Sequence, residues 1–108
     1  MKRTLYFLEN EDIRIEITAG FEGGQLVIEG YDIGQFVKEW WGDADYEYSM
    51  TLPEESVAEL RHILNLNPYA RKDLLETLAY KFNGNECFSE LQNFFEKQNI
   101  KYKHFSWA

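Results

Sequence analysis

Cysteine, proline and basic side chains are scarce in this sequence of 108 residues. The single cysteine, Cys87, excludes a disulfide within the chain and a zinc site built from several cysteines. Eleven Lys and Arg face 19 Asp and Glu, giving a net charge of −8, and this argues against nucleic-acid binding because phosphate contacts need a basic surface. No apolar run reaches the roughly 18 residues of a membrane helix, and acidic residues follow Leu8 too soon for a secretory signal. We therefore expect a cytoplasmic protein without a membrane or nucleic-acid partner.

The sequence contains enough hydrophobic residues to form a core. Hydrophobic residues make up 44% and aromatic residues 17% of the chain, which is too much for a disordered protein. The length is typical of one domain. We expect residues 1–108 to form a single domain.

Alternating apolar and polar residues predict strands in the first half. The continuous apolar run over 5–8 is typical of a strand covered on both faces. Residues 13–18 and 26–29 alternate on either side of a glycine-rich turn at 20–24, which predicts a hairpin. Helical spacing over 36–41 predicts one short helix. Residues 45–52 predict a fourth strand with Tyr46, Tyr48, Met50 and Leu52 on one face.

Apolar residues at helical spacing predict three helices in the second half, around 54–64, 74–82 and 86–97. Asn83 and Gly84 predict a left-handed end for the second of these. A final strand is expected over 101–107. The predicted fold class is α+β, an antiparallel sheet of about four to five strands with three main helices packed on one face. The predicted order is β-β-β-(short α)-β-α-α-α-β.

The acidity belongs almost entirely to the strand half. Residues 1–52 carry 4 basic and 11 acidic side chains, a net of −7, whereas residues 53–108 carry 7 and 8, a net of −1. Helices on one face of the sheet would leave the charged side chains to the other face or the loops. We expect one acidic side, which would attract a basic partner and repel nucleic acid.

The segment 32–48 combines acids with large aromatic side chains, the usual composition of a binding hot spot. We predict that this segment binds a partner, through Asp32, Glu39, Trp40, Trp41, Asp43, Asp45, Tyr46 and Glu47. The spacing of its acids lacks the calcium-loop pattern. We therefore expect no metal, no cofactor and no catalytic residue.

Three stretches resemble a group of small bacterial proteins of unassigned function: residues 29–34 (EGYDIG), 42–48 (GDADYEY) and 99–107 (IKYKHFSW with its leading Asn). Compact acidic proteins of this type are similar in character to immunity proteins, which neutralise a toxin by masking its basic active site. The resemblance implies a binding role and carries no catalytic residues over to this chain.

The leading hypothesis is a non-enzymatic acidic module that binds a basic protein, with a toxin as the most concrete partner. One alternative is a small enzyme or metal-binding protein, with a site formed by Asp32, Asp45, Tyr48 and His104. A Cys87–His dyad would be the best nucleophilic arrangement available to it. Another alternative is a homodimer that pairs through an exposed sheet edge or aromatic patch.

Overall fold

A computed structural model describes residues 1–34, 45–67 and 71–107 of the chain. In chain order these form β1 (Lys2–Glu9), β2 (Ile13–Glu22), β3 (Gln25–Gly34), β4 (Asp45–Leu52), α2 (Glu54–Ile63), α3 (Arg71–Lys81), α4 (Cys87–Lys97) and β5 (Lys103–Trp107). The predicted α+β class, with an antiparallel sheet and three helices, is confirmed. The short helix expected over 36–41 falls outside the described residues.

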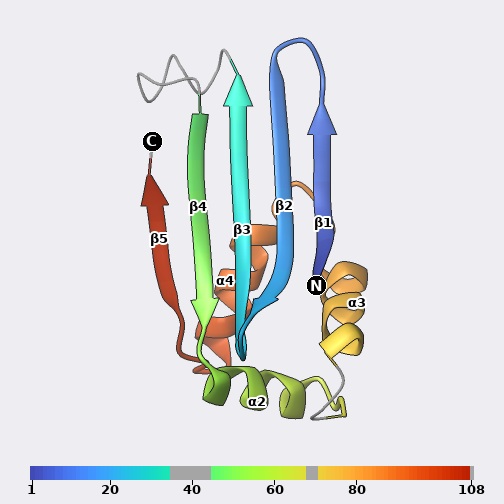
Figure 1. The fold of residues 1–108 in the computed structure, drawn as a ribbon, viewed down its shortest axis with the longest axis vertical. Coiled ribbons are helices and arrows are strands. Elements are labelled where there is room, and N and C mark those ends of the chain that lie inside the picture. The colour runs from blue at the N-terminus through green and yellow to red at the C-terminus, as the bar shows by residue number, and fades with distance from the viewer. Residues whose placement is uncertain (35–44, 68–70, 108) are drawn as a thin grey trace.

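The five strands form one antiparallel sheet in the order β1-β2-β3-β4-β5 (Figure 1). Each strand pairs with the next along the chain, and the last strand returns to the sheet as expected. The turn between β2 and β3 is tighter than predicted, because only Gly23 and Gly24 lie between the strands. Gly23 has a φ of 61°, a left-handed conformation that glycine adopts at little cost.

The core lies on one face of this sheet. Ile17 on β2, Ile28 on β3 and Met50 on β4 occupy that face and are fully buried. Leu60 of α2, Leu78 of α3 and Phe95 of α4 belong to the same buried cluster, so that all three helices contribute to it. Figure 1 shows α4 behind the strands, α2 across the end of the sheet, and α3 beside the start of β1.

The first strand is less buried than its composition suggests. Only Leu5 is fully buried, whereas Phe7 and Leu8 are exposed. The prediction of a strand covered on both faces is therefore wrong. The reason is its position at the edge of the sheet, where a register shift between Thr4 and Tyr6 interrupts the pairing with β2.

Asparagines end two of the helices. Asn65 after α2 and Asn99 after α4 have φ values of 59° and 57°. The next amides, of Leu66 and Ile100, donate to carbonyls five residues earlier, which is the Schellman arrangement. The left-handed cap predicted at Gly84 is not found, because the side-chain amide of Asn83 donates to the last carbonyls of α3 instead.

None of the helices in the described part of the chain is long and apolar enough to cross a membrane.

Candidate functional site

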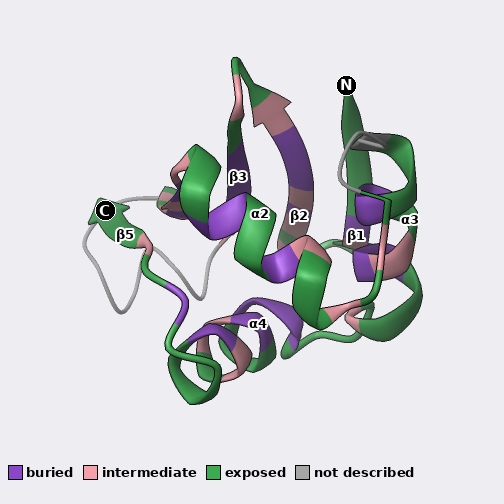
Figure 2. Cartoon of the chain, turned by 90° about the horizontal axis from the view of Figure 1, so that it is seen from below, coloured by how far each residue is buried: buried purple, intermediate pink, exposed green. Residues whose placement is uncertain are grey.

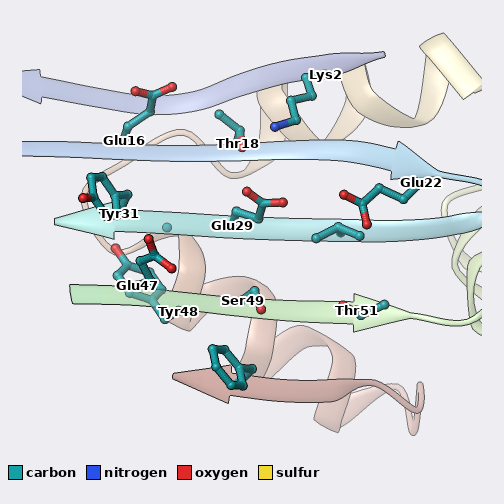
Figure 3. A pocket seen from close by; sticks show the side chains of 13 residues that line it. Lys2, Glu16, Thr18, Glu22, Glu29, Tyr31, Glu47, Tyr48, Ser49 and Thr51 are labelled. Atoms are coloured by element: carbon teal, nitrogen blue, oxygen red, sulfur yellow. The ribbon is translucent and has the colours of Figure 1, made fainter. Parts of the chain in front are cut away.

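The face of the sheet opposite the core, which we call the open face, is formed by alternate residues of each strand. Register places Glu16, Tyr31 and Glu47 side by side on β2, β3 and β4. Thr18 and Ser49 flank Glu29 in the neighbouring row (Figure 3). Side chains of a strand alternate between the two faces, so these polar residues are on the open face because Ile17, Ile28 and Met50 are buried on the other.

A hollow of about 650 Å³ lies over the open face. Its lining comes from all five strands and from no described helix. We call it the acidic hollow, and its lining residues are Lys2, Glu16, Thr18, Glu22, Val27, Glu29, Gly30, Tyr31, Glu47, Tyr48, Ser49, Thr51 and Phe105.

The acidic hollow holds more negative charge than the fold neutralises. Glu16 forms an ion pair with Arg14 at 3.3 Å, and Arg14 also contacts another carboxylate, that of Glu9, at 3.5 Å. The other three glutamates of the lining, Glu22, Glu29 and Glu47, have no ion-pair partner among the described residues. Lysine and arginine from a partner could therefore pair with them.

Aromatic side chains border the acidic hollow. The hydroxyl of Tyr31 donates to Oδ2 of Asp45 at 2.8 Å, and this hydrogen bond is the main cause that raises the pKa of Tyr31. Phe105 and Trp107 on β5 lie opposite Ser49 and Glu47, and 59% and 67% of their surfaces are exposed. Large aromatic groups next to carboxylates provide both area and charge for a contact.

On the core side of the sheet, Tyr48 anchors the middle of β3. Its ring lies over Gly30, meets the ring of Phe88 edge-on with centroids 4.7 Å apart, and donates from its hydroxyl to Oδ1 of Asp32 at 2.8 Å. Burial raises the pKa of Asp32, and the hydrogen bond from Tyr48 opposes that rise. Asp32 therefore has a structural partner on the core side of the sheet.

The described residues of the predicted binding segment 32–48 lie on both faces of the sheet. Asp45 and Glu47 are on the open face, while Asp32 and Tyr46, which pair in register, are on the core side. The ring of Tyr46 lies 5.4 Å from that of Tyr48. The remaining predicted residues fall in 35–44, outside the described part of the chain, and these are Glu39, Trp40, Trp41 and Asp43.

Sequence reasoning did not select Glu16, Glu29, Phe105 or Trp107 for the site. Glu16 and Glu29 come from the β2–β3 hairpin, whereas Phe105 and Trp107 come from β5 at the other end of the chain, and only the pairing of the strands brings them together. The strict alternation around Glu16 and Glu29 was the available signal, because it assigns both to the face opposite the isoleucines.

The sheet divides the groups named for the enzyme or metal alternative: Asp45 is on the open face, while Asp32, Tyr48 and His104 are on the core side. Asp45 projects from the open face, whereas Asp32 and Tyr48 bond to each other on the core side. His104 lies opposite Met50, and its ring centroid is 6.1 Å from that of Phe88. Within residues 1–34, 45–67 and 71–107, no group of three or more His, Cys, Asp or Glu could hold a metal ion.

Cys87, the first residue of α4, is fully buried. Burial raises the pKa of its thiol to about 11. The thiolate required of a nucleophile is therefore disfavoured at neutral pH, and the side chain acts as a small core residue.

No protein-family model, curated protein or solved structure matches this chain closely enough to show a relationship.

Proposed function

We propose that this chain is a non-enzymatic protein-binding module of the cytoplasm whose open face receives a basic protein. An immunity protein that masks the basic active site of a toxin is the most concrete form of this role. The observation that carries the proposal is the acidic hollow, in which Glu22, Glu29 and Glu47 have no ion-pair partner among the described residues. A carboxylate without a counter-charge gains a strong, charge-assisted hydrogen bond when a lysine or arginine approaches it.

The position of the charges supports a contact with a protein. Glu29 is half-buried at the centre of the open face, between Thr18 and Ser49, so that a long basic side chain would lose part of its hydration on reaching it (Figure 3). Phe105 and Trp107 stand at the border of the same face. Exposed aromatic side chains of this kind supply the contact area on which binding hot spots depend.

Trp40 and Trp41 stay in the proposal as residues that contribute buried area. The sequence places them between β3 and β4, the strands that carry Glu29 and Glu47. The short helix expected over 36–41 belongs to this part of the proposal. Replacing both tryptophans with alanine should weaken binding of a protein partner without changing the salt dependence, because no charge is removed.

The proposal can be tested by NMR titration of the labelled protein with a short arginine-rich peptide. We expect the largest amide shifts on β3 and β4 around Glu29 and Glu47. The double reversal E29K/E47K should weaken binding by about tenfold or more, because each change replaces an attraction with a repulsion. The matched control is E55K/E59K on the exposed side of α2, which changes the net charge equally.

The comparison between these two variants decides the result. Equal losses in both would show that the peptide responds only to the total charge, and the open face would have no special role. A loss of peptide affinity in E29K/E47K alone would support the open face as the binding surface. This loss should be smaller at about 0.15 M salt, where the Debye length is about 8 Å.

A further inference from the structure

The two edge strands of the sheet, β1 and β5, differ in how far they are protected from pairing with another strand. The β1 edge is interrupted by the register shift between Thr4 and Tyr6, α3 lies beside it, and Arg3 forms an ion pair with Glu76 of α3 at 3.2 Å. On β5, in contrast, the pairing with β4 is continuous over all five residues, and every one of them is exposed (Figure 2). The outer backbone N–H and C=O groups of such a strand are free to pair with another strand.

The side chains along β5 are polarised in charge. Lys103, Phe105 and Trp107 alternate onto the open face, with the lysine at one end of the strand. At the other end, Trp107 lies opposite Glu47 of β4. In the described residues no ion pair joins Lys103 to a carboxylate. The edge thus presents a cation at one end, an anion at the other, and two exposed aromatic rings.

We propose that a second copy of this chain pairs with β5 in antiparallel orientation, about a two-fold axis at Phe105, to form a continuous ten-stranded sheet. In this register Phe105 meets Phe105 of the second copy. Lys103 lies across from Trp107 of the second copy, where its ammonium group can contact the indole face. Glu47 of the second copy lies one strand beyond Trp107, so its Cα is about 9.6 Å from that of Lys103, two strand spacings of about 4.8 Å, and the two side chains must extend toward each other over the indole to pair.

Self-complementarity favours a second copy over an unrelated strand. A two-fold interface brings the same patch together with itself, so charged groups at its two ends attract only if they have opposite signs. Lys103 and Glu47 meet this requirement, which a uniformly acidic edge would not. The net charge of −8 opposes association, but at physiological salt charges more than about 8 Å apart are largely screened.

The contact is small. Pairing of five-residue strands buries less than the roughly 1,600 Å² of a standard interface. We therefore expect a weak dimer, with a dissociation constant on the order of 100 μM. Glu47 and Phe105 of the acidic hollow also belong to this contact, whereas Glu29 does not, so E29K tests the proposed function without changing the β5 edge.

Analytical ultracentrifugation of the full chain up to about 1 mM provides the test. We expect K103E alone and E47K alone each to associate at least about tenfold more weakly than the unmodified chain, since each homodimer would oppose like charges at both ends. An equimolar mixture of the two variants should recover the original affinity, because every lysine at 47 then faces a glutamate at 103. The control E29K, on the same face but away from the edge, should associate like the unmodified chain.

The mixture also separates pairing from misfolding, because two unfolded variants cannot restore a specific contact. An unmodified chain that is monomeric at the highest concentration would overturn the inference. So would a mixture that associates no better than its components, or a loss in E29K equal to that in K103E. Peptide titration of the single variant E29K, which leaves the β5 edge unchanged, tests the acidic hollow separately from these results.

Discussion

Replacement of Gly30 by alanine should destabilise the protein through a single contact, with the ring of Tyr48. A Cβ at this position would overlap Cε2 and Cζ of the ring and would lie 2.6 Å from Cδ2. The ring cannot move aside freely, because it is held edge-on to Phe88 and by the hydrogen bond to Asp32. The substitution must therefore break contacts that the native ring makes.

The magnitude follows from those contacts. An edge-on aromatic pair contributes about 0.5–1.5 kcal/mol, and a hydrogen bond to a charged carboxylate about 1.5–3 kcal/mol. Alanine in a strand recovers about 0.5–1 kcal/mol relative to glycine, because it restricts the unfolded chain. We expect G30A to lower the free energy of unfolding by about 2–3 kcal/mol, a large share of the roughly 5–15 kcal/mol of a typical domain.

Urea unfolding followed by far-UV circular dichroism measures this difference. In the Y48A background the same substitution should be neutral or slightly stabilising, since the obstructing ring is gone. Gly84 supplies a matched control, because a Cβ there meets nothing within 4 Å, and G84A should change stability by less than about 0.5 kcal/mol. The reasoning is refuted if G30A costs as much in Y48A as in the unmodified chain.

Three further predictions concern single side chains. Burial raises the pKa of Asp32 above its ordinary value of 3.8, so the native state binds this proton more tightly than the unfolded state. Stability should therefore fall as pH rises from about 4 through the native pKa, and D32N should flatten that part of a urea-unfolding pH profile. Cys87, with its pKa raised to about 11 by burial, should react with Ellman's reagent at least about 100-fold more slowly in native than in urea-unfolded protein, and equal rates would contradict its burial. The ion pair of Arg3 with Glu76 is about half exposed, so R3A should change the midpoint of thermal unfolding negligibly, corresponding to less than about 0.5 kcal/mol.

The regular elements could be predicted from sequence because their periodicity is local. In β4 the alternation assigned Tyr48 and Met50 to one face and Glu47 and Ser49 to the other, and the register confirms it. The expected end of the helix over 54–64 agrees with α2, which Asn65 closes in the left-handed conformation. Asn99 closes α4 in the same way without a glycine, whereas the left-handed cap expected at Gly84 is not found.

The sequence predicts that one face of the sheet is acidic, but it does not identify which residues lie together on that face. Acidic and aromatic residues that are close together along the chain predict a binding segment at 32–48. In a strand, neighbours such as Asp45 and Tyr46 point to opposite faces, so a cluster in sequence is divided in space. Glu16, Glu29 and Glu47 lie together only because β2, β3 and β4 are adjacent in one register.

Folding and solubility alone do not account for the composition of the open face. A polar face would satisfy both requirements with cross-strand pairs of opposite charge, each contributing about 0.2–1 kcal/mol. Glu9 of β1 and Arg14 of β2 form such a pair, but the described neighbours of Glu29 are the uncharged Thr18 and Ser49. A lysine at either position would stabilise the sheet and preserve solubility. The sequence instead leaves a half-buried carboxylate in the middle of the face that forms no ion pair with a described residue, Lys2 of the same hollow included, and a basic partner is the means we propose for supplying one.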